Sequence, residues 1–258
     1  RGLGDVYKRQ FVQRFPKHLL IIRRGNAVKA IVLSSGGVDS TTCLAMAVHE
    51  LGKENVVTLS FEYGQRHSKE LDSAQKVADY YGVRHVVFNL TQIFSFSNCS
   101  LLSNSTEKPV HESYADQIAK NGEGKVSTYV PFRNGLMLSA GAALAQSLFP
   151  EEKCEIWIGA HADDAAGNAY ADCSVGFNNA MDQAINIGTY GLVSLRAPLN
   201  RWNKAQVVAK GLELKVPYKL TWSCYDGGEK ACGECGTCID RKAAFEANGV
   251  KDPIEYFK

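Results

Sequence analysis

The sequence predicts an α/β fold in which a parallel β-sheet carries helices on both of its faces. Short apolar stretches rich in β-branched residues, such as 28–33 and 56–61, have the composition of buried strands. Between them lie longer segments whose apolar residues recur at helical spacing. Strands that alternate with helices in this way favour a parallel sheet covered on both faces.

The individual elements follow from the same patterns, taken in chain order. The predicted strands are residues 28–33, 56–61, 86–90 and 154–160, with a short extended piece at 192–196. The predicted helices are residues 40–51, 68–81, a segment from about 134, 173–188 and 203–214. Gly82 is expected to end the second helix. Residues 91–128 are polar and irregular, so we expect a long loop or lid there.

Three segments are expected along the chain. Residues 28–216 form the α/β domain, and residues 217–258, where cysteine and glycine become frequent and periodicity fades, form a small C-terminal module. Residues 1–27 begin with RGLGDVYKRQ, which resembles translated adapter sequence, and they show no clean period. We therefore expect a non-native or disordered extension there, with an Arg-rich transit peptide as the alternative.

Composition and charge favour a cytoplasmic protein with no extended nucleic-acid-binding face. The chain has 258 residues, 45% of them hydrophobic and 22% charged, and no run approaches the roughly 18 apolar residues of a membrane span. Residues 1–24 hold seven Lys or Arg against one acid, so the rest of the chain carries a net charge of −4 in spite of the overall +2. A basic face for a long nucleic acid is therefore not expected, and neither is a membrane partner.

The stretch VLSSGGVDSTTCL, residues 32–44, has the properties of a phosphate-binding loop. Gly36 and Gly37 allow φ > 0 between a strand and a helix and bring backbone N–H groups close to an anion. Hydroxyl side chains and the start of the helix near Ser40 add to the attraction. Asp39 would repel a phosphate unless Mg²⁺ lies between them, which indicates a metal-bound nucleotide. The alternative is a tight strand–helix turn with Asp39 as its cap.

SGGVDS after the first strand resembles the signature of the PP-loop ATP pyrophosphatases. Four further stretches are FEYGQRHSKE (61–70), VPFRNG (130–135), IGAHADDAAGNAYADC (158–173) and TWSCYDGGEKACGECGTC (221–238). Together they resemble the 7-cyano-7-deazaguanine synthase family over about residues 28–256. YADC departs from the pattern, because a proline is expected before its aspartate.

The resemblance implies an adenine nucleotide α-hydrolase-like fold with a loop that binds the β,γ-phosphates of ATP as pyrophosphate. The implied cofactors are ATP, Mg²⁺ and Zn²⁺. The implied ATP-binding residues are Ser34, Ser35, Gly36, Gly37, Val38, Asp39, Ser40, Thr41, Thr42, Cys43 and Leu44.

Arg133 and Lys204 are the predicted catalytic residues. Arg133 follows Pro131 just before a helix and is placed for charge-assisted hydrogen bonds to phosphate; a surface arginine is the alternative. Lys204 opens the helix after APLNRWNK, and the resemblance makes it a phosphate ligand, with a solvated lysine as the other possibility.

The predicted substrate-binding residues follow the ends of two strands. Tyr63 could stack on a flat ring or simply pack in the core. Arg66 and His67 could meet a phosphate or a carboxylate. His161 with Asp163 and Asp164 could suggest a metal site, but adjacent carboxylates converge poorly on one ion. We expect Asp163 or Asp164 to accept the paired N–H donors of a guanine-like ring instead.

Four of the eight cysteines predict a metal site. Cys224, Cys232, Cys235 and Cys238 follow C-x₇-C-x₂-C-x₂-C spacing, which satisfies tetrahedral Zn²⁺ and indicates a structural role. The resemblance also implies zinc, and an iron–sulfur cluster is the alternative. The scattered cysteines are expected to be small buried hydrophobic residues: Cys43, Cys99, Cys154 and Cys173.

The resemblance implies one reaction in queuosine biosynthesis. It is the ATP-dependent conversion of 7-carboxy-7-deazaguanine and ammonia to 7-cyano-7-deazaguanine through adenylated intermediates, with AMP and pyrophosphate released, in a homodimer without nucleic acid. The sequence does not identify the base that removes the nitrogen protons. A PP-loop tRNA thiolase and a non-catalytic zinc-bearing nucleic-acid adaptor are the alternatives. Both fit the net charge and the named stretches less well.

Overall fold

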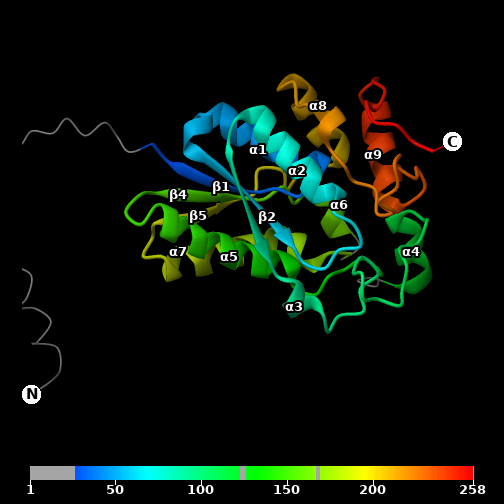
Figure 1. Ribbon diagram of the computed structural model, residues 1–258, viewed down its shortest axis with the longest axis horizontal. Helices are drawn as coiled ribbons and strands as arrows, with labels where there is room; N and C mark the ends of the chain where they lie inside the picture. Colours follow the sequence, from blue (N-terminus) through cyan, green and yellow to red (C-terminus); the bar gives the residue numbers. More distant parts are fainter. Residues whose placement is uncertain (1–26, 123–125, 167–168, 258) are drawn as a thin grey trace, which may run out of the picture.

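A five-stranded parallel sheet forms the centre of the molecule. The computed structural model describes residues 27–122, 126–166 and 169–257, and the prediction about residues 1–27 lies outside them except for residue 27. The strands are β1 Lys29–Leu33, β2 Val56–Glu62, β3 Arg84–Asn89, β4 Cys154–Trp157 and β5 Val193–Arg196. Every neighbouring pair runs parallel, in the order β3-β2-β1-β4-β5 (Figure 1). The predicted fold class is confirmed, and the extended piece at 192–196 is an edge strand.

The strand order makes β1 the switch point of the sheet. From β1 the chain moves to β2 and β3 on one side and later returns to β4 and β5 on the other. In open parallel sheets ligands bind beyond the carboxyl ends of the strands at such a point. The phosphate-binding stretch follows β1 directly, so the topology places it in this crevice.

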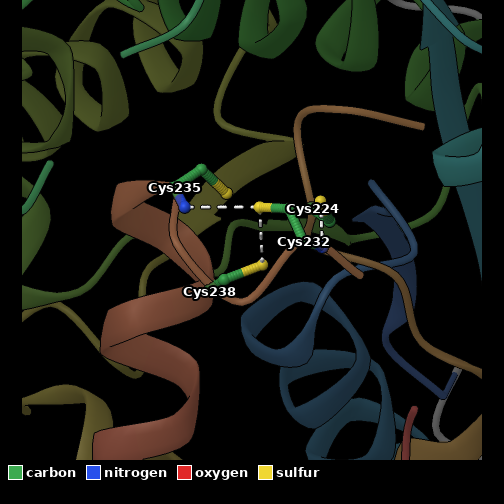
Figure 2. A group of neighbouring side chains, drawn as sticks. All are labelled: Cys224, Cys232, Cys235 and Cys238. Carbon is green, nitrogen blue, oxygen red and sulfur yellow. Dashed lines mark hydrogen bonds between the residues drawn. The ribbon is translucent and has the colours of Figure 1, made fainter. Parts of the chain in front are cut away.

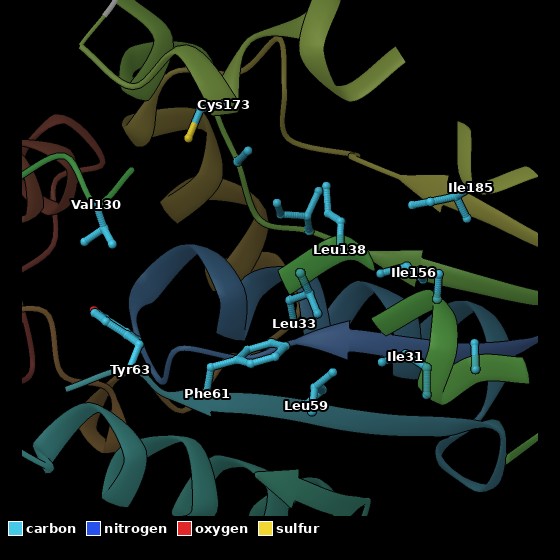
Figure 3. Packing of buried hydrophobic residues seen from close by; sticks show 14 of the residues in the cluster. Ile31, Leu33, Leu59, Phe61, Tyr63, Val130, Leu138, Ile156, Cys173 and Ile185 are labelled. Atoms are coloured by element: carbon cyan, nitrogen blue, oxygen red, sulfur yellow. The ribbon is translucent and has the colours of Figure 1, made fainter. Parts of the chain in front are cut away.

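Helices cover both faces of the sheet (Figure 1). Helices α1 Val38–Leu51, α2 Lys69–Tyr81 and α8 Lys204–Glu213 lie on one face, while α5 Arg133–Leu148 and α7 Val175–Gly188 lie on the other. Alternate residues of β1 face opposite sides: Ala30 and Val32 pack with one buried cluster, and Ile31 and Leu33 pack with the other (Figure 3). Such strands are buried on both faces, which explains their continuous apolar sequences.

Several boundaries differ from the predicted ones, and one region was misread. Helix α1 begins at Val38, β3 begins at Arg84, and β4 ends at Trp157. The segment 91–128 is not entirely irregular, because it contains α3 Thr91–Phe94 and α4 Tyr114–Asn121. The Ser113 side chain accepts a hydrogen bond from the backbone N–H of Asp116 and caps α4. This local cap starts a helix where the polar composition suggests none.

The C-terminal segment contains a helix that the faded periodicity conceals, α9 Gly236–Ala247. Its Ala244 and Phe245 are buried in the same cluster as Leu44 of α1, so the segment shares a core with the main domain. Arg241 of this helix is fully buried. Its guanidinium donates to both carboxylate oxygens of Asp252, at 2.7 and 2.9 Å. None of the helices in the described part of the chain has the length and apolar character needed to cross a membrane.

The Arg241–Asp252 pair generates a stability prediction. Asp252→Ala leaves the Arg241 charge buried without its partner, which typically costs roughly 3–5 kcal/mol of unfolding free energy. Urea denaturation measures the change. Glu255→Ala is the control, because it breaks the exposed pair with Lys230 and should leave stability nearly unchanged. Equal effects of the two substitutions would contradict the prediction.

Candidate functional site

A cavity lies at the carboxyl ends of β1, β2 and β4, where the topology predicts a ligand site. Its walls come from the loop after β1, the starts of α2, α5 and α8, the segment after β4 and the C-terminal segment. Residues far apart in the sequence therefore meet there. The predicted residues fall into three groups: those that line the cavity, those that support it and those that point elsewhere.

The loop after β1 lines the cavity with Ser34, Ser35, Gly37, Asp39 and Ser40. The Ser34 hydroxyl is buried and has no hydrogen-bond partner among the described residues. Since buried polar groups are normally paired, this hydroxyl is available to a ligand in the cavity. Helix α1 begins here with a free N-terminus, because its N-cap residue makes no side-chain capping bond. The alternative interpretation of Asp39 as a helix cap is therefore wrong.

Gly36 allows the loop after β1 to pack closely against α2. It has φ +76°, as expected, whereas Gly37 has φ −83° and needs no glycine for its backbone conformation. A Cβ atom on Gly36 would lie 2.4 Å from the carbonyl oxygen of Glu70 and 2.6 Å from the backbone nitrogen of Ala74. The start of α2 is thus packed directly against the loop.

The other predicted ATP-binding residues support the loop from behind. Val38, Thr41, Thr42, Cys43 and Leu44 are buried in α1 and do not line the cavity. The Thr42 hydroxyl bonds with the hydroxyl of Tyr218 at 2.8 Å, which ties α1 to the C-terminal segment.

Lys204 and Asp39 form an ion pair at the phosphate-loop end of the cavity. Lys204 Nζ donates to Asp39 Oδ2 at 2.5 Å, and the lysine side chain is only 13% exposed, so it is not a solvated lysine. Burial alone would raise the pKa of Asp39, but the charges of Lys204 and His161 outweigh it and lower the pKa. The ion pair also raises the pKa of Lys204 against the effect of its burial. Both groups are therefore charged at neutral pH.

The neighbouring carboxylates Asp163 and Asp164 point in different directions. Asp164 lines the cavity, and one of its oxygens lies 3.3 Å from His161 Nε2. Burial raises its pKa in spite of the nearby His161 and Lys204. Asp163 instead accepts a hydrogen bond from the backbone N–H of Lys204 at 2.7 Å and lies outside the cavity lining. Only Asp164 is placed to contact a ligand.

Arg133, Tyr63 and Glu70 form a second ionisable group in the cavity. Arg133 Nη1 donates to the Tyr63 hydroxyl at 3.3 Å, so Arg133 is not a surface arginine. Burial raises the pKa of Glu70 to about 7, although the Arg133 charge opposes the shift. Burial and the Glu70 charge raise the pKa of Tyr63 to about 12. A cation and a carboxylate that titrates near neutrality thus face the same space.

Arg66 and His67 do not line the cavity. The Arg66 guanidinium donates to backbone carbonyl oxygens of Ser100, at 2.7 Å, and of Ser105, at 3.1 Å. It holds the segment after α3 rather than a ligand. His67 packs against Gly227, where a Cβ atom would come within 2.5 Å of the imidazole ring.

Several lining residues are not among the predicted site residues, although Tyr170, Tyr225 and Thr237 lie within the quoted stretches 158–173 and 221–238. Tyr114, Tyr170 and Tyr225 come from three distant segments and meet in one wall of the cavity. The Tyr114 and Tyr225 hydroxyls hydrogen-bond, and Tyr114 packs edge-on against Tyr170. Thr237 and Asp240 of α9 also line the cavity, so the C-terminal segment contributes directly to the site. Glu70 lies within FEYGQRHSKE, but only the packing of α2 reveals its position.

The four predicted metal ligands converge at the start of α9 (Figure 2). Their Sγ atoms all lie within 4.8 Å of one another, and Cys232 and Cys238 are 3.9 Å apart. Backbone N–H groups of Cys232 and Asp226 point at Cys224 Sγ, which favours the thiolate form. A four-thiolate set of this kind fits one tetrahedral Zn²⁺. The other four cysteines are buried, as predicted: Cys43, Cys99, Cys154 and Cys173.

Comparison with known proteins points to one family. Residues 29–249 match the model of "Queuosine biosynthesis protein QueC". The chain is 44% identical to the 7-cyano-7-deazaguanine synthase of Thermoplasma acidophilum over 89% of its own length and 92% of the relative's. It is 41% identical to the synthase of Oceanobacillus iheyensis, with 88% and 98% coverage. It is 40% identical to that of Archaeoglobus fulgidus, with 88% and 90% coverage.

The cysteine cluster generates a prediction on metal content. Cys235→Ser should remove bound zinc and lower the unfolding free energy by more than about 4 kcal/mol, because loss of a structural metal is among the largest single-residue effects. Elemental analysis and urea denaturation measure the two effects. Cys154→Ala is the control, since Cys154 lies in β4 and should keep the metal. Full zinc content in Cys235→Ser would contradict the assignment.

Glu70 generates a prediction on the pH dependence of stability. Its pKa rises from an ordinary 4.5 to about 7 on folding, so ionisation of the folded protein costs stability as the pH increases through this window. Glu70→Gln removes that cost. Each pKa unit of such a shift corresponds to about 1.4 kcal/mol, and 1 kcal/mol changes the melting temperature of a chain of this size by about 2–4 °C. The melting temperature of the variant relative to the unmodified protein should therefore be higher at pH 8 than at pH 4.5 by more than about 4 °C. A difference that does not vary with pH would contradict the buried carboxylate.

Proposed function

The chain belongs to the QueC family of queuosine biosynthesis proteins, and from this premise we propose how its cavity carries out ATP-dependent nitrile synthesis. The proposed substrates are 7-carboxy-7-deazaguanine, ammonia and ATP. The proposed products are 7-cyano-7-deazaguanine, AMP and pyrophosphate. The relatives are named for the nitrile product.

One observation carries the proposal: the cavity brings together the free N-terminus of α1, the unpaired Ser34 hydroxyl of the loop after β1 and the largely buried Lys204 at the start of α8. Such donors suit the β,γ-phosphates of ATP, which would leave as pyrophosphate. Asp39 is ionised and faces the same space, so it is suited to a Mg²⁺ ion bound to these phosphates. When the nucleotide binds, Lys204 Nζ would give up its contact with Asp39 and contact a phosphate oxygen instead.

Adenylation solves the chemical difficulty of the reaction. A carboxylate is a poor acylating agent, because its leaving group would be oxide. Attack of the carboxylate oxygen on the α-phosphorus of ATP attaches AMP and releases pyrophosphate, and ammonia then displaces AMP to give the amide. A second adenylation, at the amide oxygen, allows AMP to leave again and the nitrile to form. The protein supplies positioning and charge stabilisation and needs no nucleophile of its own.

The remaining predicted residues in the cavity would contact either ATP or the deazaguanine substrate. Arg133 is a second cation that lines the cavity and would stabilise the charge that develops on the phosphoryl or carboxyl oxygens. Tyr63 presents an aromatic face beside Arg133. Asp164 would accept the paired N–H donors of the deazaguanine ring, in preference to Asp163, because only Asp164 lines the cavity.

The four-cysteine site completes the cavity rather than taking part in the chemistry. Trp222, Ser223 and Tyr225 flank Cys224, and Thr237 and Asp240 flank Cys238; all five line the cavity. A bound Zn²⁺ would therefore hold this wall in place. We also propose a homodimer located in the cytoplasm, with no nucleic acid among its ligands.

A substitution at Lys204 tests the proposal. With the acid, ammonium, Mg²⁺ and ATP present, the unmodified protein should form AMP and pyrophosphate, quantified by chromatography. Lys204→Met should lower kcat/KM for ATP roughly 100-fold or more, the usual effect of losing one donor to a developing charge. Lys210→Met, which removes an outward lysine of the same helix, is the control and should have little effect. Formation of ADP instead of AMP would refute the proposed function.

A further inference from the structure

The reaction just proposed needs a proton acceptor that none of the assigned residues supplies. Ammonia carries three N–H bonds and the nitrile carries none, so three protons must leave the nitrogen in the course of the two rounds. A base that takes one proton at a time and returns it to water could serve all three transfers. The inference that follows rests on the proposed function, because it concerns the same cavity.

Most of the ionisable groups in the cavity are committed to other partners. Asp39 is paired with Lys204, and its lowered pKa makes it a weak base. Asp164 is paired with His161. Asp240 lies among the charges around Lys204; burial raises its pKa, and the Lys204 charge opposes the rise. Lys204 itself holds its proton more tightly than usual because of the neighbouring carboxylates.

Glu70 lies outside this group around Lys204 and is influenced by Arg133 instead. It lies in the first turn of α2 and lines the cavity. Within the described ranges, its carboxylate has no hydrogen bond and no ion pair within 4.0 Å. Its own backbone carbonyl abuts Gly36, where a Cβ atom would lie 2.4 Å away. The carboxylate is therefore carried by a residue packed on the phosphate loop, in the space between that loop and Arg133.

The charges around Glu70 set its proton affinity. Arg133 faces it from α5, Tyr63 from the segment after β2, and Tyr225 from the C-terminal segment. The adjacent Lys69 does not line the cavity and places its Nζ over the Trp222 ring, 4.5 Å from the ring centroid. Burial raises the pKa of Glu70 to about 7, and Arg133 limits the rise. At neutral pH such a carboxylate both accepts and returns protons, as a general base must.

We infer that the Glu70 carboxylate is the general base that removes the nitrogen protons during amide and nitrile formation. In the first round the nitrogen lone pair forms the N–C bond, and the C–O bond to AMP breaks with its electron pair on the phosphate oxygen. One nitrogen proton passes to Glu70. In the second round the amide oxygen attacks the α-phosphorus, pyrophosphate leaves, and a second proton passes to Glu70. The last N–H electron pair then forms the third C–N bond as AMP departs, and Glu70 accepts that proton.

The test separates adenylation from proton transfer. Exchange of labelled pyrophosphate into ATP, measured with the acid and without ammonia, reports adenylation alone. Rapid-quench measurement of amide formation at a fixed concentration of free ammonia reports the step that needs the base. The variants are Glu70→Gln and, as a control, Asp72→Asn, which removes the same charge from the first turn of the same helix outside the cavity.

Glu70→Gln should slow amide formation roughly 100-fold or more, the usual contribution of a general base. Its rate of pyrophosphate exchange should stay within about threefold of that of the unmodified protein. Its amide-forming rate should no longer increase as the pH rises through 7. Glu70→Asp should restore part of that pH-dependent rate, and Asp72→Asn should behave as the unmodified protein does.

Two results would overturn the inference. One is an amide-forming rate in Glu70→Gln that keeps both its size and its pH dependence. The other is a parallel fall of pyrophosphate exchange and amide formation, which would place Glu70 in substrate binding. Absence of acid-dependent exchange in the unmodified protein would instead refute the proposed function, so the two failures are distinguishable.

Discussion

The ion pair between Lys204 and Asp39 fixes the phosphate end of the cavity, and the rest of the site is arranged around it. It joins the start of α8 to the start of α1 across the carboxyl edge of the sheet. Both partners are largely buried, so each holds the other in its charged form. In the proposed function, such a site would keep a cation ready for phosphate and a carboxylate ready for Mg²⁺, each neutralised by the other before the nucleotide binds.

The C-terminal segment packs against α1, which follows the loop of this site. Phe245 packs in the core beneath α1, and the Tyr218 hydroxyl meets Thr42 just behind the phosphate loop. The cysteine cluster then fixes the remaining backbone, which has little apolar core of its own. In the proposed assignment, a Zn²⁺ ion held by these cysteines would order this wall of the cavity without taking part in the chemistry.

Local patterns in the sequence predict the parts of the site that are themselves local. The glycine pair after an apolar strand predicts a phosphate loop, and the structure places this loop at the cavity. The cysteine spacing predicts a metal site, and the structure brings the four Sγ atoms together. The direction of a side chain cannot be predicted from such local patterns. Arg66 and His67 follow β2 as closely as Tyr63 does, yet they turn to the segment at 100–105 and to Gly227, because the path of the chain after the strand depends on those distant partners. Glu70, Tyr114 and Asp240 line one cavity because α2, α4 and α9 pack around it, and no spacing in the sequence predicts this.

Labelling the carboxyl group of 7-carboxy-7-deazaguanine with oxygen-18 tests the central claim most directly. If each oxygen leaves as part of an adenylate, every nitrile formed should be accompanied by two molecules of AMP, each carrying one labelled oxygen, as measured by mass spectrometry. Label found in inorganic phosphate or in water, with unlabelled AMP, would contradict the account. It would mean that the loop after β1 does not position the α-phosphorus for attack by the substrate.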